Sequence, residues 1–104
     1  MSSELIISEE LSEGFARIFI SGEIDIYTGG KFKERLYDAI DTHKMDLKID
    51  CSGLNYIDST GLGIFVGALK KTRLNGNDIY IENLKDNIKK LFLITGLDKL
   101  FIIE

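Results

Sequence analysis

From residue 15 onward, the sequence alternates between segments spaced like strands and segments spaced like helices, and this alternation limits the possible folds most. Apolar residues recur at every second position in segment 15–21, whereas later segments repeat them at three- and four-residue intervals. Because a strand that returns to the same sheet through a helix runs parallel to its predecessor with a right-handed crossover, the pattern predicts a largely parallel sheet. The strand-like segments are 15–21, 47–51, 78–82 and 100–103.

A further strand-like segment, Glu4 to Glu9, precedes this alternation. The link from Glu10 to Gly14 is short and polar and ends in glycine, which predicts an antiparallel hairpin between the first two strands. The chain is therefore expected to form an α/β fold with one mixed, mostly parallel sheet of about five strands, an antiparallel N-terminal hairpin and three to four helices.

Three amphipathic helices are predicted from the apolar spacing. The second is expected to run from about Thr60 to Leu74, where a turn at 75–77 stops it, and the third to end at Gly96 as a left-handed residue. The expected buried faces are Phe32, Leu36, Ala39 and Ile40 in the first helix, Leu62, Phe65, Val66 and Leu69 in the second, and Ile88, Leu91, Phe92 and Thr95 in the third.

The size and composition indicate one globular domain, expected to span residues 1–104. A net charge of −4, with acidic and basic residues interspersed, argues against nucleic acid or a membrane surface as a partner. No apolar run approaches the roughly 20 residues that span a bilayer, and no signal peptide is recognisable, so we expect a cytoplasmic protein. Acidic charge and modest size suit a monomer.

Cys51 and His43 are the only residues of their kinds. Neither an internal disulfide nor a metal site of the Cys/His kind is therefore expected, and no cofactor is expected. Because Cys51 ends an apolar strand-like segment, we expect it to be a small buried side chain rather than a reactive thiol.

The residues Asp58, Ser59 and Thr60 join the segment around 47–57 to the second predicted helix. Side chains of these types commonly cap a helix, because they accept hydrogen bonds from its first backbone N–H groups. A purely structural role as a helix cap is therefore one interpretation of this stretch.

A phosphorylation site at Ser59 is the other interpretation. Gly61 and Gly63 each weaken a helix by roughly 1 kcal/mol relative to alanine, which indicates that approachable backbone is favoured over stability in this first turn. The helix N-terminus would tolerate a phosphate through its dipole and free N–H groups, whereas Asp58 would repel it. About two added negative charges at this corner would act on a docked partner as a switch.

Three segments resemble the anti-sigma factor antagonists of the STAS domain class, and in their order and spacing they cover nearly the whole chain. The first, Gly22-Glu23-Ile24-Asp25-x-x-Thr28, is similar to the family's Gly-Glu-Leu-Asp-x-x-Thr segment. The second, Tyr56-Ile57-Asp58-Ser59-Thr60-Gly61-Leu62-Gly63, looks like its phosphorylation-site loop. The third, Leu91-Phe92-x-x-x-Gly96-Leu97, resembles the end of its C-terminal helix. Family members usually continue into a further helix after the strand that is predicted to end this chain.

The resemblance implies a cytoplasmic bacterial regulator that, while unphosphorylated, binds an anti-sigma factor and so frees a sigma factor to join RNA polymerase. In this family the anti-sigma factor is an ATP-dependent serine kinase that modifies the first hydroxyl after the motif aspartate, here Ser59, and a PP2C-type phosphatase removes the phosphate. The chain would then be a substrate and a ligand, not an enzyme. Carried over by motif, the docking surface around Ser59 includes Asp25, Asp58, Thr60 and Gly61, although capping or orienting the first helix is an alternative role for Asp25.

Ile64 is a further candidate for partner binding. At 100° per residue it lies about 200° from Leu62 on the helix, opposite the predicted buried face, one turn from Ser59 and next to Ala68. An apolar side chain aimed at water beside a switch indicates a partner contact, and a singly exposed isoleucine with no such role is the alternative.

Two other classes of function are alternatives. A serine hydrolase would need a base for Ser59, but His43 is predicted at the tail of the first helix and no Gly-x-Ser-x-Gly motif is present, which leaves only a lysine base. The second class is a scaffold or binding module of the same fold in a stress-sensing or other assembly, which need never carry phosphate.

Overall fold

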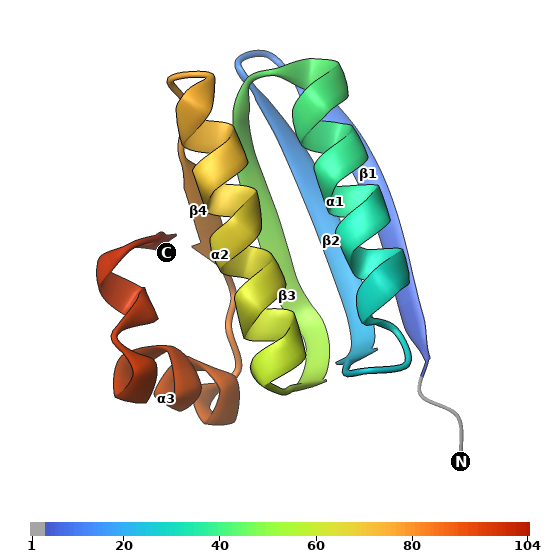
Figure 1. Ribbon diagram of the computed structural model, residues 1–104, viewed down its shortest axis with the longest axis vertical. Helices are drawn as coiled ribbons and strands as arrows, with labels where there is room; N and C mark the ends of the chain where they lie inside the picture. Colours follow the sequence, from blue (N-terminus) through green and yellow to red (C-terminus); the bar gives the residue numbers. More distant parts are fainter. Residues whose placement is uncertain (1–3) are drawn as a thin grey trace.

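The computed structural model describes residues 4–104, in which strands and helices alternate along the chain. In chain order the elements are β1 (Leu5–Ser12), β2 (Phe15–Ile24), α1 (Gly29–His43), β3 (Asp46–Ile57), α2 (Ser59–Leu74), β4 (Ile79–Glu82), α3 (Asp86–Thr95), the 3-10 helix η1 (Leu97–Lys99) and β5 (Ile102–Ile103). The strands lie side by side in the order of the sequence, with β1 antiparallel to β2 and each later pair parallel (Figure 1). The predicted α/β fold with an antiparallel N-terminal hairpin is confirmed.

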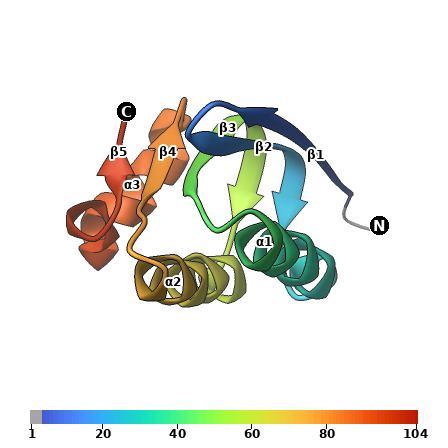
Figure 2. The same ribbon diagram turned by 90° about the horizontal axis from the view of Figure 1, so that it is seen from above.

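Helices α1 and α2 cover one face of the sheet, as Figure 2 shows from above. Ile18, Ile49 and Ile81 are register partners on the three central strands, and all three side chains are buried in the core. Helix α1 buries Phe32, Leu36, Ala39 and Ile40, the face that the sequence predicts. The core therefore lies between the sheet and these two helices.

Helix α2 buries Phe65 and Leu69 as predicted, but its buried face is rotated from the predicted one. Its buried residues are Gly61, Phe65, Ala68, Leu69 and Thr72. Leu62 and Val66, predicted as buried, are only partly covered. The reason is close approach, because a Cβ on Gly61 would lie 2.5 Å from Ile57 Cγ1 and 2.7 Å from Ile24 Cγ2. A glycine, rather than a bulky residue, therefore faces the ends of β2 and β3.

The C-terminal part of the chain packs through aromatic rings. The ring of Phe65 in α2 lies 5.8 Å from that of Phe92 in α3 and 6.0 Å from that of Phe101, centroid to centroid. Gly96 ends α3 with φ +77°, as predicted. Thr95, predicted to be buried, is instead exposed, and its hydroxyl donates to the carbonyl of Leu91.

The last strand is shorter than the predicted Leu100 to Ile103. The N–H groups of Leu100 and Phe101 both donate to the carbonyl of Leu97, so the chain is still turning there and only Ile102–Ile103 reaches the sheet as β5. Within residues 4–104, no helix is both long and apolar enough to cross a membrane.

Strands β2 and β3 are longer than predicted, and their extra length carries them to the candidate site. The predicted segment 47–51 is the first half of β3, which continues to Ile57. In this second half, Gly53 passes so close to β2 that a Cβ on it would lie 2.9 Å from Ser21 Cβ. Cys51 is buried, as expected, and burial raises the pKa of its thiol to about 12.

Candidate functional site

Two strand-to-helix junctions lie next to each other at the carboxyl ends of β2 and β3. Ile24 and Ile57 are register partners at these ends, and the backbone N–H of Asp58 donates to the carbonyl of Ile24 at 3.2 Å. The loop 25–28 and the start of α2 thus form one edge of the molecule, the edge where ligands of open α/β sheets usually bind. We call residues 25–29 and 58–64 the junction surface.

Asp58 caps helix α2. Its backbone is extended, with φ −113° and ψ −171°, and its Oδ1 atom accepts from the N–H groups of Thr60 at 2.9 Å and Gly61 at 3.4 Å. Such a cap satisfies two of the four N–H groups that a helix leaves unpaired at its start. The capping role foreseen for this stretch is therefore performed by the aspartate alone.

Ser59 is the first residue of α2, and its side chain is exposed. None of the hydrogen bonds of the cap uses its hydroxyl, because both come from the carboxylate of Asp58. The hydroxyl is accordingly presented at a helix N-terminus, where the helix dipole favours added negative charge.

Thr60 and Gly61 sit between the two junctions. The methyl carbon of Thr60 lies 3.0 Å from the position that a Cβ on Gly29 would occupy, so Thr60 packs against the first residue of α1 and is half-buried. Gly61 is buried against the ends of β2 and β3. Both residues place α2 relative to its surroundings, and Ser59 is the more accessible of the two hydroxyl residues.

Asp25 and Thr28 fold the loop between β2 and α1. Asp25 Oδ1 accepts from the N–H groups of Tyr27 at 2.8 Å and Thr28 at 3.1 Å. The Thr28 hydroxyl donates to the carbonyl of Glu23 at 2.8 Å and accepts from the N–H of Asp25 at 3.0 Å. Because Thr28 makes no side-chain cap of α1, these bonds shape the loop ahead of the helix. The orienting role considered for Asp25 therefore matches its contacts.

Ile64 is half-buried rather than aimed at water, which corrects the expectation from the helical wheel. Its Cδ1 atom lies 3.4 Å from the position that a Cβ on Gly29 would occupy, and the side chain packs against the core. Ala68, placed on the same outer side by the wheel, is fully buried. Both shifts follow from the rotated face of α2, which turns Ile64 toward α1.

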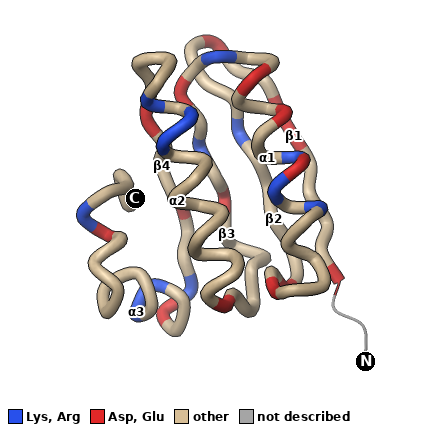
Figure 3. Tube along the Cα trace, in the orientation of Figure 1, with Lys and Arg blue, Asp and Glu red and all other residues tan. Residues whose placement is uncertain are grey.

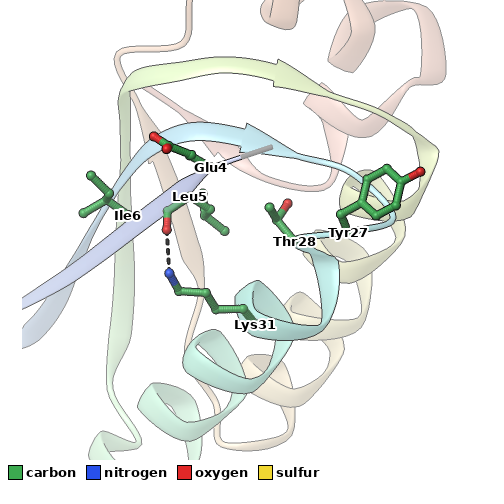
Figure 4. A pocket seen from close by; sticks show the side chains of 6 residues that line it. All are labelled: Glu4, Leu5, Ile6, Tyr27, Thr28 and Lys31. Atoms are coloured by element: carbon green, nitrogen blue, oxygen red, sulfur yellow. Dashed lines mark hydrogen bonds between the residues drawn. The ribbon is translucent and has the colours of Figure 1, made fainter. Parts of the chain in front are cut away.

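The most exposed apolar side chains of the junction surface were not singled out from the sequence. Ile26 is 69% exposed and Tyr27 is 78% exposed. A shallow hollow of about 400 Å³ adjoins Tyr27 and is lined also by Glu4, Leu5, Ile6, Thr28 and Lys31 (Figure 4). Lys31 Nζ donates across it to the carbonyl of Leu5 at 2.6 Å. The sequence signal that could have identified them is the presence of two large apolar residues in the short loop between Asp25 and Thr28.

The surroundings of Ser59 do not supply the histidine base that a serine nucleophile would use. His43 is the last residue of α1, whereas the first residue, Gly29, faces Thr60. A helix of this length separates its two ends by about 20 Å. His43 Nε2 lies instead 3.4 Å from Glu9 Oε2. In the part of the chain that the structure describes, no group of histidine, cysteine or acidic side chains is arranged to hold a metal ion.

The family model and the relatives found by comparison with known proteins agree on one family. Residues 7–104 match the family model of the STAS domain. An anti-sigma-B factor antagonist of Listeria monocytogenes is 42% identical over 87 residues, which are 84% of this chain and 76% of that protein. A protein of the same name from Staphylococcus aureus is 36% identical over 96 residues, covering 92% and 89%. The crystal structure of an anti-sigma factor antagonist from Mycobacterium paratuberculosis superposes with a TM-score of 0.83 at 24% identity, over 96% of this chain and 85% of that one.

Proposed function

The chain belongs to the STAS domain family, and we propose that it is an anti-sigma factor antagonist switched off by phosphorylation of Ser59. The relatives at 42% and 36% identity bear that functional name and align over most of their length. While unphosphorylated, the protein binds an anti-sigma factor through the junction surface and so frees a sigma factor. We further propose that the protein is cytoplasmic and monomeric and that residues 1–104 form one domain.

The observation that supports this proposal most is that neighbouring residues at the start of α2 have different structural roles. Asp58 caps the helix, Thr60 packs against α1 and Gly61 packs against the sheet, whereas Ser59 is exposed and outside the cap. A kinase can therefore reach the Ser59 hydroxyl without dismantling the helix N-terminus. A hydroxyl needed for the cap would be a poor site for modification, because phosphorylation would remove a stabilising bond.

A phosphate on Ser59 would change the charge of the junction surface more than its shape. Segments 25–29 and 58–64 contain Asp25 and Asp58 but no lysine or arginine, and Figure 3 shows acidic positions at both junctions. The phosphate adds about two negative charges beside Asp58, which already occupies the first N–H groups of α2. We expect an interface that closes on the Ser59 hydroxyl to exclude the phosphate, because the phosphate would lose its hydration there.

The partners proposed for this cycle are an anti-sigma factor that is itself a serine kinase using ATP, and a PP2C-type phosphatase that restores the hydroxyl. The chain is their substrate and ligand and carries no cofactor of its own. Asp25, Asp58, Thr60 and Ile64 are proposed to contribute side chains to the docking surface, and Gly61, which is buried, contributes through the position that it gives α2. For Ile64 this role is confined to the part of its side chain that α1 leaves uncovered.

The direct test is phosphorylation by the cognate anti-sigma factor and ATP, read by intact mass on the wild type, Ser59→Ala and Thr60→Ala. We expect one added phosphate on the wild type and on Thr60→Ala, and none on Ser59→Ala. If the wild type gains no phosphate from a kinase that is active on another substrate, the scaffold interpretation replaces this one and the Asp58 stretch is only a helix cap.

A further inference from the structure

Ile26 and Tyr27 expose two large apolar side chains side by side, although nothing in the local fold requires them. Their neighbours Ile24 and Thr28 are buried, whereas these two are 69% and 78% exposed. The loop is held by Asp25 and Thr28, and Tyr27 contributes to it only a backbone N–H. An aromatic ring and a branched aliphatic chain that are left in water beside a candidate docking site indicate a contact with another molecule.

The position of this pair places it beside Ser59. The N–H of Asp58 donates to the carbonyl of Ile24, two residues before Ile26, and Gly29, two residues after Tyr27, packs against Thr60. The two ends of the loop between β2 and α1 therefore both touch the start of α2. In Figure 4, Tyr27 projects from the loop away from the hydrogen bond between Lys31 and Leu5. A molecule that covers both junctions would meet this loop.

The charge around the pair restricts what that molecule can be. Glu23, Asp25 and Asp58 are the only charged side chains between residues 23 and 30 and between 55 and 64. Carboxylates beside an apolar contact repel nucleic acid and anionic lipid, and they complement an apolar recess rimmed by lysine or arginine on a protein. Tyrosine is also among the residues that most often dominate protein interfaces.

We propose that Ile26 and Tyr27 form the apolar anchor through which the anti-sigma factor holds the unphosphorylated protein. This inference rests on the proposed function, because it names a second contact of the same partner. The anchor supplies affinity that does not depend on phosphate, and Ser59 supplies the switch. The partner surface that receives it is an apolar recess with basic side chains at its rim.

The test measures the dissociation constant of the full chain for the cognate anti-sigma factor, for the wild type and for Ile26→Ala, Tyr27→Ala and Leu74→Ala. Leu74 is a matched control, because it is 87% exposed and ends α2 about 20 Å from Ser59. We expect Tyr27→Ala to weaken binding by at least about tenfold and Ile26→Ala by several fold, whereas Leu74→Ala stays within about twofold. All variants should keep the unfolding midpoint of the wild type, because the replaced side chains are exposed.

The outcomes separate this inference from the function on which it rests. If the wild type does not bind an anti-sigma factor of demonstrated activity, the proposed function fails and the anchor with it. If the wild type binds while both loop variants bind equally well, only the anchor is overturned. Sedimentation of the wild type, but not of Tyr27→Ala, with phosphatidylglycerol vesicles and unchanged binding to the anti-sigma factor would assign the pair to a lipid surface instead.

Discussion

The two strand-to-helix junctions contain the same residue types, but these residues have different roles. Each follows a parallel strand with an aspartate and then a hydroxyl residue before a helix. At the first junction the hydroxyl of Thr28 is buried, and its hydrogen bonds to Glu23 and Asp25 hold the loop. At the second, Asp58 alone makes the cap and the hydroxyl of Ser59 is exposed. An aspartate followed by a hydroxyl residue thus makes a structural corner in one place and, as we propose, a site of modification in the other.

The largest change in the free energy of unfolding is expected where the second junction approaches the sheet. Gly61→Ala should lower the free energy of unfolding by about 3 kcal/mol, because its Cβ would overlap the side chains of Ile57 and Ile24. Gly63→Ala is the control, since nothing lies within 4 Å of its added Cβ. Urea unfolding of both variants measures the difference, and equal stabilities would contradict the close packing of α2.

The buried hydroxyl gives the next largest effect. Thr28→Val keeps the shape of the side chain but leaves the carbonyl of Glu23 and the N–H of Asp25 without their partner, which should cost about 2 kcal/mol. Ser59→Ala should change stability by less than about 0.5 kcal/mol, because its hydroxyl is exposed and outside the cap. Denaturant unfolding of the pair tests the comparison directly, and a larger loss in Ser59→Ala would reverse it.

The capping carboxylate of the second junction should matter less than the buried hydroxyl of the first. Asp58→Ala removes the acceptor for the N–H groups of Thr60 and Gly61, which should cost about 1 kcal/mol. Asp58→Asn retains an acceptor oxygen and should restore most of that loss. The thermal midpoints of the two variants provide the measurement, and an unchanged midpoint in Asp58→Ala would show that the cap adds no stability.

The smallest effect concerns the glycines at the start of α1. Gly30→Ala should raise the free energy of unfolding by about 0.5 kcal/mol, because its added Cβ meets nothing within 4 Å and alanine favours a helix. Gly29→Ala should give no such gain, since its Cβ would stand 3.0 Å from the Thr60 methyl carbon. Chemical unfolding of both variants is the check, and an equal gain would mean that the two junctions do not touch at Gly29.

The order of elements was predictable from the sequence because each signal is local. Alternating residues in 15–21, the face of α1 and the left-handed Gly96 depend on neighbours within a turn or two of the chain, and all three are confirmed. The predicted start of the last strand was wrong, because the carbonyl of Leu97 accepts backbone hydrogen bonds that keep the following residues in a turn, and apolar spacing does not reveal such bonds.

The details of the site depend on contacts between distant segments. On the helical wheel, the side with the bulkiest apolar residues was taken as the buried face. This choice favoured Leu62 and Val66 and placed Ile64 in water. The close approach of Gly61 to β2 and β3 turns the helix instead and brings Ile64 against Gly29. That a helix starts within a residue of Ser59 was predictable, whereas the burial of Thr28 and the exposure of Tyr27 depend on how the loop packs.

The central claim is that phosphate on Ser59 changes what the junction surface binds, and the most direct measurement compares two forms of one protein. The dissociation constant for the cognate anti-sigma factor would be measured for the unmodified chain and for the chain phosphorylated on Ser59, with identical unfolding midpoints as the check on the fold. We predict at least about a hundredfold weaker binding of the phosphorylated form, because an interface that closes on the Ser59 hydroxyl would have to bury a hydrated dianion, which costs several kcal/mol. Equal affinity of the two forms would contradict it.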